Sequence, residues 1–214
     1  MAKEIRLRGA EGTSFTLIVE GEAIEISLAL LGKHFVPNAL SAIAVASLFG
    51  MELEKSKEAL ERFQPSPMRM EIVHLKGGKT LINDAYNANP KSMELALQVL
   101  AEMKGRGRAI AVLGDMLELG DFSVEAHQHI GQRVKELSID FLLALGEEAP
   151  VLVESAIRHG LDSEKARIVE SHTEASSILR KMVRDGDWIL VKGSRRMGME
   201  KGKIVGLRRS HKRE

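Results

Sequence analysis

Cysteine is absent from all 214 residues of the sequence. This absence excludes disulfide bonds, thiolate metal sites and cysteine nucleophiles, and it is typical of a reducing compartment. No apolar run approaches the roughly 18 residues that a membrane-spanning helix needs. The first residues, Met1 to Glu4, lack the apolar core of a signal peptide. We therefore expect a cytoplasmic protein with no membrane partner.

The sequence also has little excess charge, because 31 Lys and Arg residues oppose 30 Asp and Glu residues and the formal net charge is +1. A nearly neutral chain has no global field that would attract nucleic acid, so we expect no nucleic-acid partner. A short basic run, Arg208 to Arg213, is more typical of a frayed terminus than of a binding patch. A chain of this length can bury a core without a disulfide or metal staple.

The first part of the chain has the pattern of a small mixed domain. Between residues 5 and 26, three short alternating runs separated by glycine-containing turns predict antiparallel strands. Two helices are expected next, at about 39–49 and 53–63, the first opened by Pro37.

Two prolines then interrupt the chain, Pro65 and Pro67, and the pattern changes beyond them. We therefore predict two domains, one over residues 1–64 and one over residues 65–214.

The second part begins with a predicted hairpin over residues 70–84, after which apolar runs and amphipathic stretches alternate. The expected strands are 109–113, 141–145, 166–169 and 188–191, and the expected helices are 90–103, 123–137, 149–158, 173–184 and a last one from about Met197. Continuous apolar strands that alternate with helices of this length predict a parallel sheet with right-handed crossovers. The fold class is therefore α/β, with a mostly parallel, doubly wound sheet and helices on both faces.

The densest polar motif, N-D-A-Y-N-A-N-P, lies between an expected strand and an expected helix. It contains four side chains that form hydrogen bonds: Asp84, Tyr86, Asn87 and Asn89. Asn is a favoured N-cap and Pro a favoured first helical residue, so the helix should begin at Asn89-Pro90. A strand, a polar loop and a helix N-terminus form a usual nucleotide or anion site. A capped turn whose side chains bind only their own backbone is the alternative.

Two further polar loops follow expected strands and should lie at the same edge of the sheet. G-D-M-L-E-L-G carries Asp115 and Glu118, which suit a substrate amine or a metal-bound phosphate, although solvated acids in an ordinary loop would look the same. K-G-S-R-R brings Lys192, Ser194 and Arg195 together before an expected helix. Cations are unfavourable at a helix N-terminus unless an anion is present, so this loop favours a carboxylate or phosphate ligand.

Two other motifs do not indicate a functional site. Gly78-Lys79-Thr80 is not a phosphate loop, because that pattern needs a glycine at the position of Val73 and a helix afterwards. His127 and His129 are two residues apart on an expected helix and point to different faces, so they are poor metal ligands as a pair. We predict no metal site within this chain.

Five motifs occur in one order: G-K-H-F-V-P-N-A-L-S-A-I-A, P-S-P-M-R-M-E, N-D-A-Y-N-A-N-P, G-D-M-L-E-L-G and K-G-S-R-R-M-G-M-E. Together they resemble the Mur ligases of peptidoglycan synthesis, over about residues 5–207. Within that family, the D-x-Y-N-A-N-P and K-G-S-R elements are similar to those of ligases that join D-alanyl-D-alanine to UDP-N-acetylmuramoyl-tripeptide.

The resemblance implies a three-domain enzyme of which this chain holds a part. Residues 1–64 would be a small α+β remnant of the central ATPase domain, and residues 65–214 the C-terminal Rossmann-like ligase domain. ATP and Mg²⁺ would be the cofactors, and an acyl phosphate the intermediate of amide formation. The magnesium ligands, the phosphate loop and the UDP-binding domain would lie outside the chain, which would then be inactive alone. We expect a monomer.

The resemblance also implies roles for particular residues. Asn38 would face the adenine, Arg69 the γ-phosphate and Asp84 the ribose hydroxyls. The whole nucleotide set would be His34, Asn38, Arg69, Asp84, Tyr86, Asn87 and Asn89. The substrate set would be Asp115, Lys192, Ser194 and Arg195, and the catalytic residues would be Arg69 and Lys192.

Two positions depart from the family pattern: Phe35 stands where Asn usually follows the His, and Met68 stands where Gly usually precedes the Arg. Loss of the amide at position 35 would weaken adenine recognition. Two alternatives stay open. One is a Rossmann-like module that binds a nucleotide or dipeptide without turnover, and the other is a sibling Mur-type ligase with another amino substrate.

Overall fold

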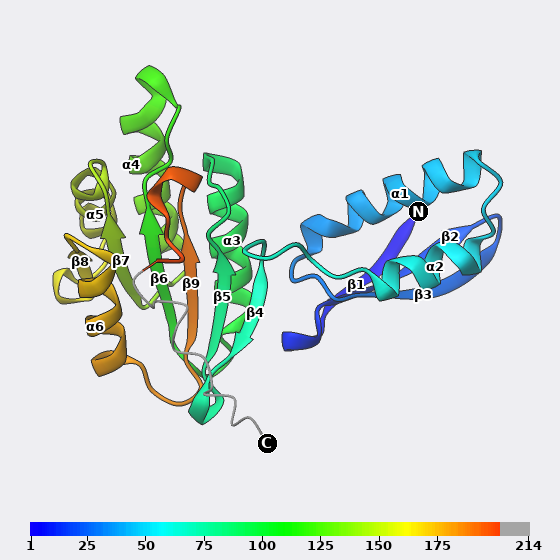
Figure 1. Ribbon diagram of the computed structural model, residues 1–214, viewed down its shortest axis with the longest axis horizontal. Helices are drawn as coiled ribbons and strands as arrows, with labels where there is room; N and C mark the ends of the chain where they lie inside the picture. Colours follow the sequence, from blue (N-terminus) through cyan, green and yellow to red (C-terminus); the bar gives the residue numbers. More distant parts are fainter. Residues whose placement is uncertain (202–214) are drawn as a thin grey trace. The chain divides into compact units, whose positions relative to one another are not determined.

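The computed structural model describes residues 1–201, and the chain divides into two compact units between Ser66 and Pro67 (Figure 1). Within the described residues, no helix is both long enough and apolar enough to cross a membrane. The basic run Arg208 to Arg213 lies outside the described residues, as does most of the helix expected from Met197. The segment around Met197 forms only a three-residue 3-10 turn, Arg195–Met197.

The first unit is a three-stranded antiparallel sheet with two helices. The strands are β1 (Ala2–Leu7), β2 (Thr13–Val19) and β3 (Glu22–Leu28), and the helices are α1 (Val36–Leu48) and α2 (Leu53–Arg62). Phe15 and Ile26 from the sheet pack against Val36 and Ile43 from α1 in one apolar core. The three predicted strands are confirmed. Helix α1 begins three residues earlier than predicted, because Pro37 is accommodated in its first turn.

The second unit is a six-stranded sheet with the order β4-β5-β9-β6-β7-β8. Its strands are β4 (Glu71–His74), β5 (Thr80–Asp84), β6 (Ala109–Gly114), β7 (Phe141–Leu145), β8 (Ala166–Ile168) and β9 (Trp188–Lys192). Strand β4 pairs antiparallel with β5, and all the other pairs are parallel. The predicted hairpin and the mostly parallel sheet are therefore confirmed.

Helices cover both faces of this sheet, as predicted. The helices are α3 (Pro90–Met103), α4 (Ser123–Glu136), α5 (Ala149–Arg158) and α6 (His172–Met182). Leu179 of α6 packs in one core with Ile110 of β6 and Val191 of β9. Helices α3, α4 and α5 pack side by side and lie against the other face. Because side chains alternate along a strand, Asp84 and Lys192 face this second layer.

Strands β5, β9 and β6 are neighbours, and all three end at the same edge of the sheet. The three polar loops singled out in the sequence follow directly from these ends. The fold therefore brings together motifs that are far apart in the chain.

Candidate functional site

The loop after β5 ends in the predicted helix cap. The side-chain oxygen of Asn89 accepts a hydrogen bond from the Ser92 N–H at 2.8 Å, and the Asn89 N–H donates to the Ser92 hydroxyl at 3.1 Å. Pro90 is the first residue of α3. The side chain of Asn89 therefore serves its own helix, and a contact between Asn89 and a nucleotide stays a prediction.

A buried ion pair joins the ends of β5 and β9. Asp84 and Lys192 lie opposite each other in the register, and Lys192 Nζ donates to Asp84 Oδ2 at 2.5 Å. Lys192 is only 2% exposed and also donates to the Asn87 carbonyl at 3.0 Å. The other oxygen of Asp84 accepts the Met70 N–H at 3.0 Å. The pair fixes the start of the polar loop, and this pairing was not predicted from the sequence.

Ser194 connects all three loops. Its N–H donates to the Asp115 carbonyl at 2.9 Å, and its hydroxyl accepts the Leu117 N–H at 2.8 Å. The same hydroxyl donates to the Ala88 carbonyl at 3.3 Å. Because Ser194 is buried and its hydroxyl both accepts and donates, its geometry supports the loops, and a direct substrate contact stays a prediction.

Asp115 is also buried, and its carboxylate organises the loop after β7. Its two oxygens accept the Glu147 N–H at 2.7 Å and the Glu148 N–H at 3.2 Å. Burial raises the pKa of Asp115 above its usual value, against the opposing effect of these N–H groups. A side chain at Gly146, whose φ is +134°, would place its Cβ 2.3 Å from this carboxylate. A substrate role for Asp115 stays a prediction.

Two glycines allow the loops after β6 and β9 to approach each other. A Cβ at Gly193 would lie 3.0 Å from the Gly114 Cα and 2.7 Å from the Met199 side chain. A Cβ at Gly114 would lie 2.6 Å from the sulfur of Met199. The G-D-M and K-G-S motifs therefore require glycine because their backbones pack together under Met199.

Exposed side chains lie around these buried residues. The guanidinium carbon of Arg69 lies 4.1 Å from the centre of the Tyr86 ring, and Tyr86 is 42% exposed. The Arg195 N–H donates to the Asn87 side-chain oxygen at 3.3 Å. The Arg195 guanidinium pairs with Glu200 at 2.6 Å, which raises the pKa of Arg195. Two cations and an exposed amide side chain therefore lie around the loop after β5, an arrangement suited to an anionic ligand.

His34 and Asn38 belong to the first unit. The His34 ring lies 4.2 Å from the Phe35 ring, and Asn38 is exposed in the first turn of α1. A contact of either residue with a nucleotide stays a prediction.

The contacts of His127 were not predicted from the sequence, where this residue was considered only as a metal ligand. His127 is 0% exposed, and its Nε2 lies 3.0 Å from the Met116 backbone nitrogen. Since an amide N–H can only donate, Nε2 is the acceptor and Nδ1 carries the hydrogen, which points to the Ser123 carbonyl at 2.8 Å. A sequence signal was present, because His127 lies in the first turns of the helix that follows the G-D-M loop.

The described residues do not fit a magnesium site. Among residues 1–201, no group of three or more His, Asp or Glu side chains is placed to hold a metal ion.

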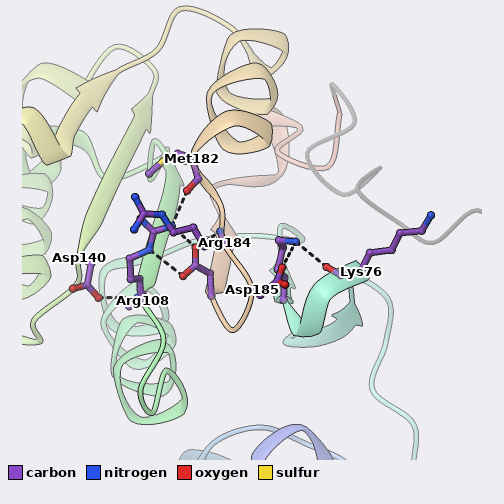
Figure 2. Close-up of polar contacts among 9 residues, drawn as sticks. Lys76, Arg108, Asp140, Met182, Arg184 and Asp185 are labelled. Carbon is purple, nitrogen blue, oxygen red and sulfur yellow. Dashed lines mark hydrogen bonds and ion pairs between the residues drawn. The ribbon is translucent and has the colours of Figure 1, made fainter.

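The opposite edge of the sheet carries a second polar cluster (Figure 2). Arg108 donates from Nε to Asp187 at 3.0 Å and from Nη2 to the Met182 carbonyl at 2.7 Å. Asp187 also accepts the Arg184 N–H at 2.7 Å. Burial acts to raise the pKa of Asp187, but the bonds from Arg108 and Arg184 outweigh it and hold the pKa below its usual value. This cluster ties together strand and helix ends.

Comparison with known proteins identifies the second unit. A family model described as "Mur ligase, glutamate ligase domain" matches residues 68–195. A curated relative from Bacillus subtilis, named UDP-N-acetylmuramoyl-tripeptide–D-alanyl-D-alanine ligase, is 37% identical over 193 residues, which cover 89% of this chain and 41% of the relative. A relative of the same name from Escherichia coli is 33% identical, with 89% and 41% covered.

A crystal structure of MurF from Acinetobacter baumannii has the same fold, with a TM-score of 0.83 and 32% identity. The match covers 96% of this chain and 44% of that structure. The chain therefore spans about two fifths of the length of the proteins it matches.

Proposed function

The chain belongs to the Mur ligase family, and from this premise we propose that it supplies part of a ligase that joins D-alanyl-D-alanine to UDP-N-acetylmuramoyl-tripeptide. The observation that carries the proposal is the joining of three motif loops at one edge of the sheet by Lys192 and Ser194. The proposed reaction uses ATP to form an acyl phosphate, which the dipeptide amine attacks. Catalysis of this kind depends on positioning and on cations near the developing charge.

The Asp84 loop is proposed to bind the nucleotide. A carboxylate offers about four lone-pair sites, so Asp84 can accept a ribose hydroxyl while it stays bonded to Lys192 and to the Met70 N–H. Tyr86, Asn87 and Asn89 would complete this wall, with His34 and Asn38 of the first unit at the adenine. Arg69, held over the Tyr86 ring, would supply the cation for the terminal phosphate.

The K-G-S-R loop is proposed to bind the dipeptide. Lys192 and Ser194 are buried and already bonded, whereas the side chain of Arg195 is 46% exposed. We therefore assign Arg195 to the carboxylate of the incoming dipeptide, because a guanidinium can bind a carboxylate through two parallel bonds. Lys192 and Ser194 would hold Arg195 and the loop after β5 in place, and Asp115 would support the neighbouring loop.

We further propose that the chain alone does not complete the reaction. Its 214 residues contain no phosphate-loop pattern, and residues 1–201 do not fit a magnesium site. The UDP-sugar, and the ATP phosphates apart from the proposed contact with Arg69, would then be bound by sequence that the relatives have and this chain does not match. No step through magnesium is assigned to these residues.

Phosphate release tests this proposal. The purified chain would be incubated with ATP, magnesium, UDP-N-acetylmuramoyl-tripeptide and D-alanyl-D-alanine, with and without the unmatched N-terminal part of the Bacillus subtilis relative. We expect no release from the chain alone and dipeptide-dependent release from the combination. Release by the chain alone would refute the incomplete phosphate site. A preference for a single amino acid over the dipeptide would indicate a sibling ligase, and ligand binding without release in the combination would indicate a binding module.

A further inference from the structure

We infer that His127 is a positioning residue of this site, which acts from helix α4 through Met116 and Ser194 on the loops that carry Asn87 and Arg195. The inference rests on the proposed function, since it assigns His127 to the ligand-binding geometry of the same loops. His127 itself touches no proposed ligand group.

The first link is the bond between His127 and the loop after β6. The imidazole is fully buried, and both of its nitrogens are bonded: Nδ1 to the Ser123 carbonyl at 2.8 Å and Nε2 to the Met116 N–H at 3.0 Å. The first bond fixes the ring relative to its own helix, and the second fixes the loop. A buried polar group keeps its partners because losing one leaves the other unsatisfied.

The second link runs through adjacent amides. Met116 and Leu117 are consecutive, so the bond at Met116 also sets the direction of the Leu117 N–H, which donates to the Ser194 hydroxyl at 2.8 Å. That hydroxyl donates in turn to the Ala88 carbonyl at 3.3 Å, in the loop after β5. His127 is therefore the outer end of a hydrogen-bond chain that crosses all three loops.

The chain ends where ligand groups are proposed. Ala88 lies between Asn87 and Asn89, and Ser194 precedes Arg195, whose N–H donates to the Asn87 side chain at 3.3 Å. A displacement of the Met116 amide would thus change the positions of both Arg195 and Asn87. Helix α4 has independent attachments, such as the Ser155 hydroxyl of α5, which donates to the Gln128 carbonyl at 2.6 Å. The hydrogen bond from the Met116 N–H to His127 therefore fixes the loop after β6, while other contacts hold helix α4 in place.

Amide hydrogen exchange in the full chain tests the coupling. His127→Leu should speed exchange roughly tenfold at the amides of Met116, Leu117 and Arg195. The Met116 N–H loses its buried acceptor, and the hydrogen bonds of the Leu117 and Arg195 N–H groups are held less firmly as a result. His127→Gln should restore slow exchange, since its side-chain oxygen can accept the Met116 N–H. The amides of Ala109 and Trp188 at the opposite edge should not change. Faster exchange confined to Met116, or equal at every protected amide, would overturn the inference.

A dipeptide titration then separates positioning from stability. We expect His127→Leu to raise the apparent Kd for D-alanyl-D-alanine roughly tenfold. This is the effect expected when one charged contact, that of Arg195 with the dipeptide carboxylate, is no longer aligned. Ser155→Ala is the matched control, because it removes a buried bond to the same helix away from the loops. Unchanged affinity in His127→Leu would overturn the inference. Absence of dipeptide binding by the unaltered chain, with the coupled exchange intact, would instead count against the proposed function.

Discussion

At the amino edge of the sheet the buried carboxylate of Asp187 faces Arg108, and at the carboxyl edge that of Asp84 faces Lys192. The first pair also contacts the Met182 carbonyl, the Arg184 N–H and the Phe141 ring, which lie at or beside the ends of regular elements. The second pair instead holds a polar loop, around which exposed aromatic, amide and cationic side chains gather. A buried ion pair therefore does not mark a binding site by itself, and the side chains that it supports make the difference.

The largest expected effect on stability is at the amino edge. Arg108→Met should lower the free energy of unfolding by about 3 kcal/mol, because it leaves the carboxylate of Asp187 buried without its cation. Urea denaturation would measure this loss. Ligand binding by the folded fraction should be unchanged, and a selective loss of binding would contradict the structural role of this edge.

The matching change at the carboxyl edge should affect both stability and binding. Asp84→Ala should cost about 2 kcal/mol, because it leaves the buried Lys192 without its carboxylate. It should also raise the KM for ATP in the combined enzyme about tenfold, the cost of roughly one lost charged hydrogen bond. Asp187→Ala is the control, with a stability loss but no change in KM. An unchanged KM in Asp84→Ala would rule out the ribose role.

The two edges should respond to pH with opposite signs. The pKa of Asp187 is lowered by folding, so its stabilising contribution is present above the unfolded pKa of about 3.9 and is lost as the pH falls through the folded value. The pKa of Asp115 is raised, so its ionised form costs stability at neutral pH, and this cost disappears as the pH falls through the folded value toward about 3.9.

Urea denaturation at a series of pH values would show this difference. The unaltered chain should lose unfolding free energy as the pH falls below about 4, and Asp187→Asn should make this loss smaller. It should gain unfolding free energy as the pH falls toward about 4 from above, and Asp115→Asn should abolish this gain. The same slope change in both variants would contradict the assignment of opposite shifts.

The smallest stability effect is expected at Arg195. Its guanidinium is exposed and paired with Glu200 at the surface, so Arg195→Ala should leave the free energy of unfolding nearly unchanged. Affinity for D-alanyl-D-alanine should nevertheless fall. Arg180 is an exposed cation on α6, so Arg180→Ala is the matched control. Equal effects of the two variants on affinity would contradict a role of Arg195 in binding the dipeptide.

Local patterns in the sequence predicted much of the second unit. Its strands are continuous apolar runs and its helices are amphipathic, and Asn89-Pro90 marks a helix start by side-chain chemistry alone. The helix expected from about Met197 lies mostly outside the described residues, and the described residues at its start form a 3-10 turn, Arg195–Met197. At the start of α6, Ser171 accepts the Glu174 N–H as an N-cap, and the Glu174 carboxylate accepts the Glu170 N–H.

The contacts inside the site could not be predicted in the same way. Asp84 and Lys192 are 108 residues apart, and their pairing depends on β9 lying between β5 and β6 in one register. The role of His127 likewise depends on how α4 packs under the loop after β6. Such contacts come from strand order and helix packing, which hydrophobic periodicity does not specify.

Binding of ATP to the isotopically labelled chain, combined with the unmatched N-terminal part of the Bacillus subtilis relative and mapped by the shifts of the chain's amide resonances, tests the central claim most directly. We expect the amide resonances of Tyr86, Asn87 and Arg195 at the carboxyl edge to shift, and those of Ala109 and Trp188 at the amino edge to stay unchanged. Shifts at the amino edge, or none at the carboxyl edge, would contradict the assignment of the three joined loops as the ligand-binding site.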